Sequence, residues 1–208
     1  MKIYFIRHGQ TVENLHGILQ GHRPGILTQL GHAQAQRVAE RLSQIPFDAI
    51  YASDLGRVVE TARYVAAHQA APVVYDPQLR ERGVGIYEGL PRRVLWEAEA
   101  KSGHPPVDFR PEGGESFRDL QERIEQFLRR LQQEAAGQTV LLVSHGGWNR
   151  QLLGLAMRRT IGESLQIEQF NACVNRVNCP KDGPLSIELT NCVRHLEVEP
   201  RLLPSTSN

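Results

Sequence analysis

Residues 139–146 read TVLLVSHG, and this stretch decides the fold. Its first five residues, Thr139 to Val143, are apolar without alternation, so we expect a strand that is covered on both faces. A second strand of this kind is predicted over KIYFIR, residues 2–7, and it runs directly into His8 and Gly9. Both strands therefore end in a histidine followed by a glycine, and a glycine lets backbone approach a ligand closely.

Working outward from these strands, strand and helix patterns alternate along the chain. Thr28 is expected to cap a helix that ends near Gln44, and Ser116 to begin a helix with Asp119 at its third position. Further helices are expected over 54–67 and 147–157, and further strands over 47–51 and 73–75. Strands over 171–179 and 185–190, joined by residues 180–184, are expected to form a hairpin.

This alternation predicts an α/β fold with three layers, α/β/α. The sheet should be mostly parallel, with helices on both faces and an antiparallel edge hairpin near the C-terminus. We expect one domain over residues 1–199 and a disordered polar tail over 200–208. In such sheets ligands bind beyond the carboxyl ends of the strands, where both histidines lie.

The composition excludes several classes of protein. The chain has 208 residues, with 24 Lys and Arg against 23 Asp and Glu, so its net charge of +1 argues against a nucleic-acid or anionic-lipid partner. There is neither an export signal nor a run of the ~20 apolar residues that a membrane span needs, so a cytoplasmic location is expected. The three cysteines lack C-x-x-C spacing and are expected to be buried thiols, although pairing of Cys179 with Cys192 stays open.

Side chains suited to phosphoryl transfer follow several of these strands. The reaction needs a nucleophile, positive charge around the phosphoryl oxygens and a proton for the leaving oxygen. A neutral imidazole, arginine and a carboxylic acid can supply these three functions. The candidates are Arg7 and His8 after the first strand, Arg57 in the second helix, Glu81 after the third strand and His145 after the fourth.

A set of short motifs, in order along the chain, carries a resemblance to a known family. The motifs are Arg7-His8-Gly9-Gln10-Thr11 with Asn14, Gln20-Gly21, Leu27-Thr28 with Gly31, Ser53-Asp54-Leu55 with Arg57 and Thr61, Leu79-Arg80-Glu81, Glu88-Gly89, Gly114-Glu115-Ser116, and Ser144-His145-Gly146. Over about residues 1 to 196 the chain resembles the histidine phosphatase superfamily, the phosphoglycerate mutase-like clan.

The resemblance implies a role for each matching residue. His8 would be the nucleophile that becomes phosphohistidine, and Glu81 would be the general acid and base. The phosphoryl group would be clamped by Arg7, Arg57 and His145. The remaining substrate-binding positions would be Asn14, Gln20, Gly21 and Gly146. Neither a metal nor a cofactor is implied, and the partner is a small phosphomonoester; a homodimer stays open.

Two enzymatic interpretations compete, a phosphatase and a cofactor-dependent phosphoglycerate mutase that uses the same phosphohistidine. Mutases that resemble this family carry a longer insertion between the acid and the second histidine, and a tyrosine three residues after the acid, where this chain has Val84. Both differences favour water as the acceptor. A binding module that has lost its catalytic activity would lack some catalytic residues, but every catalytic position is filled here. A metal hydrolase would need carboxylate ligands beside His8 and His145, and neither histidine has one beside it. The sequence therefore supports neither alternative.

Less specific interpretations stay open for single residues. Glu81 could instead form an ion pair with Arg80 or Arg82, and Glu88 competes with it for the role of acid. Arg57 could pair with Asp54 or Glu60 at the surface. Arg92 and Arg93 either bind a longer anionic substrate or solvate the start of a helix. The substrate itself also stays open among phosphorylated hydroxy acids, phosphoserine, sugar phosphates and intermediates of cobalamin synthesis.

Overall fold

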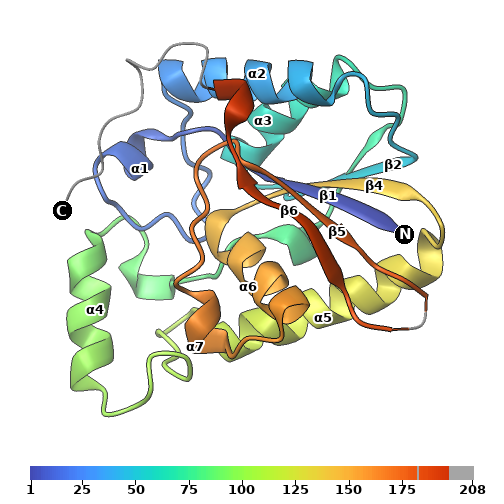
Figure 1. Ribbon diagram of the computed structural model, residues 1–208. Coiled ribbons are helices and arrows are strands. Elements are labelled where there is room, and N and C mark those ends of the chain that lie inside the picture. The colour runs from blue at the N-terminus through green and yellow to red at the C-terminus, as the bar shows by residue number, and fades with distance from the viewer. Residues whose placement is uncertain (182, 197–208) are drawn as a thin grey trace.

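A single mixed sheet forms the centre of the computed structural model, which describes residues 1–181 and 183–196 (Figure 1). Its strand order is β3–β2–β4–β1–β5–β6. The strands are β1 (Lys2–Arg7), β2 (Ala49–Ala52), β3 (Val73–Tyr75), β4 (Thr139–Ser144), β5 (Val174–Asn178) and β6 (Ser186–Cys192). The first four are parallel, and β5 runs antiparallel to both of its neighbours. The predicted mostly parallel sheet with an antiparallel hairpin at its C-terminal edge is confirmed.

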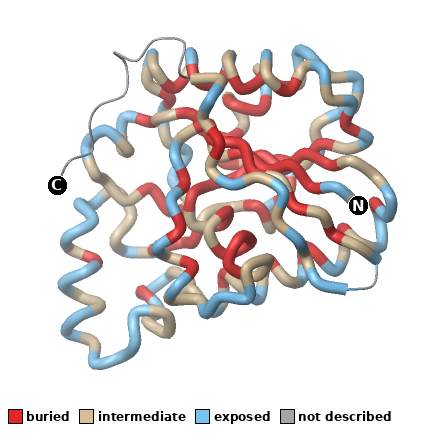
Figure 2. Tube along the Cα trace, in the orientation of Figure 1, coloured by how far each residue is buried: buried red, intermediate tan, exposed pale blue. Residues whose placement is uncertain are grey.

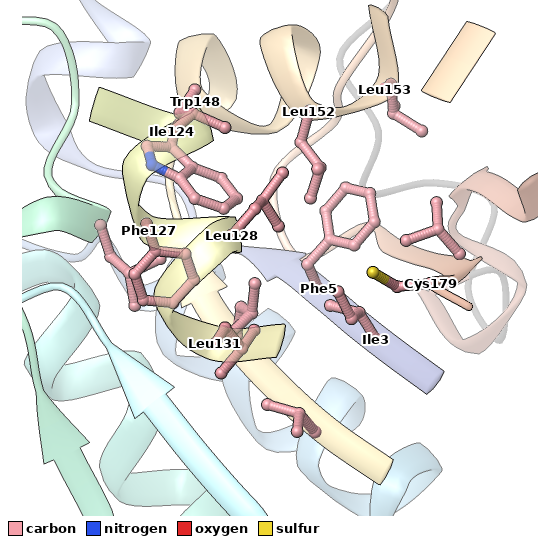
Figure 3. Close-up of a cluster of buried hydrophobic side chains, with 14 of the residues drawn as sticks. Ile3, Phe5, Ile124, Phe127, Leu128, Leu131, Trp148, Leu152, Leu153 and Cys179 are labelled. Atoms are coloured by element: carbon pink, nitrogen blue, oxygen red, sulfur yellow. The ribbon is translucent and has the colours of Figure 1, made fainter. Parts of the chain in front are cut away.

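Helices cover both faces of this sheet, as the unbroken apolar strands predict. Along β4, Val140 and Leu142 point to one core, and Leu141 and Val143 point to the other. In Figure 2 most of the central strands are coloured as buried. The first core is closed by α5 (Phe117–Glu134) and α6 (Gly146–Met157), and Figure 3 shows their side chains against β1. The second core is closed by α2 (Gln29–Leu42) and α3 (Gly56–Ala66).

The two helix starts that were expected from capping residues are confirmed. The Thr28 hydroxyl accepts a hydrogen bond from the backbone N–H of Gly31, so it caps α2. At the start of α5, Ser116 and Asp119 each accept a bond from the other's backbone N–H and form a capping box. These caps satisfy N–H groups that have no partner inside the helix.

The C-terminal hairpin is shorter at its start than predicted. The strand was expected from Asn171, but β5 begins only at Val174. Ala172 has a φ of +54°, and its N–H donates to the carbonyls of Arg7 and His8, so the chain turns here instead of pairing as a strand. The turn therefore fastens the hairpin to the end of β1. The second strand, expected to end at Thr190, continues to Cys192.

Three further helices are short or solvent-exposed: α1 (Val12–Leu15), α4 (Arg92–Lys101) and α7 (Ile161–Ser164), and only the start of α4 was considered, as one of the two interpretations of Arg92 and Arg93. Of these, α4 stands to one side of the sheet in Figure 1, and only its Leu95 is buried. A helix with one buried residue has almost no apolar stripe, which is why periodicity does not reveal it.

The cysteines are buried and unpaired, which confirms the expectation of buried thiols and shows that Cys179 and Cys192 do not form a disulfide. The expected disorder of residues 200–208 falls outside the described residues. Within the described part of the chain, no helix combines the length and the apolar character that a membrane crossing requires.

Leu142→Ala should lower the free energy of unfolding by about 2–5 kcal/mol, because the side chain is fully buried between β4 and α5 and its loss leaves a cavity. Urea unfolding followed by circular dichroism measures the change. Glu122→Ala, on the exposed side of α5, is the control and should change stability by less than about 0.5 kcal/mol. Equal effects of the two substitutions would contradict this description of the core.

Candidate active site

The ends of β1 and β4 bring the two predicted histidines together. These strands are parallel neighbours in which Arg7 pairs with Ser144, so the next residue of each strand is a histidine. The ring centroids of His8 and His145 lie 5.3 Å apart, with their planes at 64°. Both side chains are almost completely buried. The expectation that these strand ends converge on one place is therefore met.

His8 is held as a neutral imidazole with a defined tautomer. Its Nδ1 lies 2.7 Å from the carbonyl oxygen of Gly9. Because a carbonyl can only accept, Nδ1 carries the proton and Nε2 keeps its lone pair. Burial lowers the pKa of His8 well below the usual value for histidine, and the charges of Arg57 and Arg7 act in the same direction. A neutral imidazole with a free nitrogen is a competent nucleophile.

His145 lies beside His8 and is anchored from the other side. Its Nε2 is 2.9 Å from the hydroxyl of Ser53, at the end of β2. Burial, followed by the charge of Arg57, lowers the pKa of His145 well below the usual value, so this ring too is neutral. Its Nδ1 is buried and has no hydrogen-bond partner among the described residues.

Two buried guanidinium groups flank His8. Arg7 donates to the carbonyl of Gln169 at 2.6 Å, and Arg57 donates to the carbonyls of Arg23 at 2.6 Å and Gly21 at 2.9 Å. Burial lowers the pKa of each arginine to about 10, so both remain charged at neutral pH. The surface ion pair considered for Arg57 does not form, because that side chain is 1% exposed and Asp54 binds Arg80 instead.

Glu81 is fixed at the N-terminus of α6. One carboxylate oxygen accepts from the N–H of Gly147 at 2.9 Å, and the other accepts from the N–H of Trp148 at 3.2 Å. The alternative ion pairs with Arg80 and Arg82 are absent from the described residues, since these arginines bind Asp54 and Glu99. The competing Glu88 accepts a bond from the N–H of His22 and does not line the cavity described next.

A cavity of about 450 Å³ opens over these groups. Its wall includes every predicted site residue except His145, whose ring lies 5.3 Å from that of His8: Arg7, His8, Asn14, Gln20, Gly21, Arg57, Glu81 and Gly146. The Asn14 oxygen is occupied by the Thr11 N–H and the Asn171 amide, so its own amide nitrogen is left for a ligand. Within the described residues, no group of His, Cys, Asp and Glu side chains is arranged to hold a metal.

Sequence analysis did not predict every residue of this cavity wall. Arg150 was not singled out, although it lies one helical turn after Gly146 and so shares its face of α6. Arg92, left open above, also lines the cavity, as do Leu95, Trp96 and Glu99 of α4. Since α4 buries only Leu95, no periodic signal could have placed these residues at the site.

The structure gives a further reason for Gly9, which the sequence did not predict. We expected this glycine to let a ligand approach, but a Cβ at this position would lie 2.3 Å from the carbonyl oxygen of Gly31. Glycine is therefore required by the close packing of the β1 end on the first turn of α2. That contact holds the loop on which His8 sits.

Together, these features define an α/β protein with a cavity beyond its strand ends, built around a neutral histidine and two buried arginines. A family model for the histidine phosphatase superfamily (branch 1) matches residues 3–192. The chain belongs to this superfamily, as its motifs indicated.

Known relatives include both phosphatases and mutase-like proteins. The adenosylcobalamin/alpha-ribazole phosphatase of Escherichia coli strain K12 is 35% identical over 166 residues, which are 78% of this chain and 80% of that protein. Phosphoglycerate mutase-like protein 4 of Arabidopsis thaliana is 35% identical over 208 residues, 94% of this chain and 87% of that protein. The phosphoserine phosphatase of Entamoeba histolytica, solved with 3-phosphoglyceric acid, superposes with a TM-score of 0.82 at 27% identity, covering 94% of this chain and 98% of that chain.

Acidification should destabilise the protein in the range below the usual histidine pKa. His8, His145 and His195 all have lowered pKa values, that of His195 being about 4. Between the unfolded and folded values the unfolded chain binds protons that the folded chain does not, so the free energy of unfolding falls as pH falls. The slope should reach at most about 1.4 kcal/mol per pH unit for each such histidine.

Urea unfolding at about pH 7.5 and about pH 5.5 measures this loss. The variant His145→Gln removes one of the three groups and should show a shallower dependence than the unaltered protein. A stability that rises on acidification over this range would contradict the burial of neutral histidines.

Proposed function

We propose that the protein is a metal-independent phosphatase that hydrolyses a small phosphomonoester through a phosphohistidine on His8. The observation that carries the proposal is the state of His8, whose Nδ1 is bound to the Gly9 carbonyl while the ring lines a cavity between Arg7 and Arg57. The free Nε2 is thereby directed to the place where two fixed cations favour a phosphoryl group.

In the first step, Nε2 of His8 attacks phosphorus and the bond from phosphorus to the ester oxygen breaks. Glu81, as the carboxylic acid, donates its proton to that oxygen, which leaves as an alcohol. The backbone N–H groups of Gly147 and Trp148 hold the Glu81 carboxyl group at the cavity wall.

In the second step, Glu81 takes a proton from water, the water oxygen attacks phosphorus and the bond from phosphorus to Nε2 breaks. Inorganic phosphate leaves, and His8 returns to the neutral imidazole. Arg7, Arg57 and His145 stabilise the charge on the phosphoryl oxygens in both steps. Three of their buried nitrogens, Nε of each arginine and Nδ1 of His145, have no hydrogen-bond partner among the described residues. A bound oxyanion would supply the acceptors that these nitrogens lack, which supports this role.

A mutase would differ only in the group that accepts the phosphoryl from His8, and a relative with a mutase-like name makes this a real alternative. The segment between Glu81 and His145 is shorter than the insertion that the family resemblance implies for mutases. It nevertheless contains α4, which contributes Arg92, Leu95 and Trp96 to the cavity wall. This chain has Val84 where mutases have a tyrosine, which still favours water as the acceptor. The experiment below distinguishes hydrolysis from isomerisation.

His8→Ala should abolish phosphate release, because no other side chain at the cavity has a comparable free nitrogen. A panel of phosphomonoesters is assayed for released phosphate and, in parallel, for conversion of 3-phosphoglycerate to 2-phosphoglycerate. The unaltered protein, quenched during turnover of a ³²P-labelled ester, should carry label that is stable to base and labile to acid. His8→Ala should carry none.

The variant Ser43→Ala, at the exposed end of α2, is the matched control and should behave as the unaltered protein. Residual turnover of His8→Ala near that of the control would remove His8 as the nucleophile. Isomerisation of phosphoglycerate that exceeds phosphate release would replace the phosphatase with the mutase.

Glu81→Gln should slow hydrolysis of alkyl phosphates by ~10²–10⁴-fold, because the alkoxide then leaves without a proton. An ester of p-nitrophenol has a good leaving group and should be affected far less in the phosphorylation step. Burst kinetics on both substrates separate phosphorylation from dephosphorylation. Equal losses of the phosphorylation rate for the two esters would show that Glu81 does not act as the acid.

A further inference from the structure

Glu81 lies in a segment that regular secondary structure does not hold. Residues 80–83 belong to neither a helix nor a strand. Backbone carbonyls in such a segment have no partner in a helix or a sheet, so other groups must bind them if the segment is to keep one position. The reaction depends on that position, because an acid must lie within hydrogen-bond reach of the ester oxygen that it protonates.

The side chain of Arg123, in the second turn of α5, supplies donors to this segment. Its Nη1 donates to the carbonyls of Gln78 and Arg80, each at 2.8 Å, and its Nη2 donates to the carbonyl of Glu81 at 3.2 Å. Glu115 accepts from Nε with one carboxylate oxygen and from Nη2 with the other, both at 2.9 Å. These five contacts match the five N–H donors of a guanidinium group.

Glu115 fastens the same segment on the other side of Glu81. Its Oε2 also accepts from the N–H of Gly83 at 2.9 Å, and its own N–H donates to the Gly83 carbonyl at 2.8 Å. The ion pair of Glu115 with Arg123 carries no net charge, so it holds the segment without adding a net charge beside the acid. Glu115 belongs to the motif over residues 114–116, to which the proposed reaction steps give no role.

Other contacts do not replace Arg123. Three side chains each hold one carbonyl in or next to the segment: Ser144 at Leu79, Trp148 at Gln78 and His22 at Glu81. In the described part of the chain, the Arg80 carbonyl is bound by the Arg123 side chain alone. Loss of Arg123 therefore frees the backbone directly before Glu81 while both ends of the segment stay bound.

The acid is held at two separate points by two helices. Its carboxyl group accepts from the N–H groups of Gly147 and Trp148 at the start of α6, and its backbone is held by Arg123 of α5. These helices pack on the same core and lie side by side in Figure 1. Neither Arg123 nor Glu115 lines the cavity, so both act on the reaction only through the segment that they hold.

We infer that Arg123 and Glu115 are positioning residues for the general acid. They fix the backbone at Glu81, so that its carboxyl group lies where the ester oxygen leaves and where water later attacks. The inference rests on the proposed function and deepens it. A misplacement of ~1 Å can cost ~10²-fold in rate, so contacts that hold this segment matter for the reaction as well as for stability.

The test compares an ester that needs the acid with one that does not. The first is whichever of 3-phosphoglycerate, phosphoserine and glucose 6-phosphate is hydrolysed fastest, and the second is p-nitrophenyl phosphate. Phosphorylation rate constants are measured in single turnovers with the protein in excess, so they do not depend on the fraction that is folded. Arg123→Gln should lower the rate constant for the alkyl ester by about 10–100-fold and that for p-nitrophenyl phosphate far less.

The background variant Glu81→Gln separates positioning from a general structural effect. If Arg123 acts through Glu81, adding Arg123→Gln to Glu81→Gln should not change the ratio of the two rate constants any further. Arg129→Gln is the matched control, because Arg129 is an exposed arginine on the same helix and pairs only with Glu125. It should leave both rate constants unchanged.

Glu115→Gln tests the same segment with a smaller change. The amide keeps the size of the side chain but leaves one acceptor oxygen for the three donors that the carboxylate binds. This substitution should produce a selective loss for the alkyl ester in the same direction as Arg123→Gln, but smaller. The Glu115 side chain is 24% exposed, so the variant also serves if Arg123→Gln does not fold.

A folded variant of Arg123 or Glu115 that affects both esters equally, or neither, would overturn the positioning role and leave the phosphatase intact. A further change of the ratio in the Glu81→Gln background would also overturn it. If Glu81→Gln itself slows both esters equally, Glu81 is not the acid and has no need of positioning. Absence of phosphate release from every ester would end the proposed function and this inference with it.

Discussion

The parallel pairing of β1 with β4 is the constraint on which the rest of the site depends. Because Arg7 is opposite Ser144, both strands end at the same level and both continue into a histidine. A shift of β1 by one residue relative to β4 would move each of its alternating side chains from one hydrophobic core to the other. Because both faces of β1 are buried, core packing enforces the observed register. The packing of the core thus fixes the 5.3 Å separation of the two imidazoles.

This placement has an energetic cost that the backbone partly offsets. Two guanidiniums and two imidazoles are buried at one edge of the sheet, and the described residues contain no carboxylate paired with Arg7 or Arg57. Carbonyls of Gln169, Gly21 and Arg23 bind the arginines instead. Neutral acceptors hold the cations in place without cancelling their charge, so the charge remains for a ligand.

The sequence could predict those parts of the molecule that a large core controls. The sequence of residues 139–143 predicted a central strand because both faces of that strand are buried and apolar. Thr28 and Ser116 predicted helix starts because their hydroxyls accept hydrogen bonds from N–H groups that have no partner inside the helix. The positions of the site residues followed from these strand ends. By contrast, α4 buries only Leu95, and the start of β5 depends on a turn at Ala172 that bonds to the end of β1. Neither feature has a local periodic signal.

The same difference separates the two histidines at the strand ends from the cavity residues on α4 and α6. His8 and His145 sit on strand ends that the core cannot move, so their geometry is insensitive to surface changes. Arg92 lies on a helix that the structure attaches mainly through Leu95 and the Arg82–Glu99 pair, and that helix can therefore change without disturbing the sheet. Arg150 is intermediate, since α6 packs on the core but its side chain extends into the outer cavity. Changes in α4 can therefore alter the outer wall of the cavity, while the strand ends that hold His8 and His145 stay as they are.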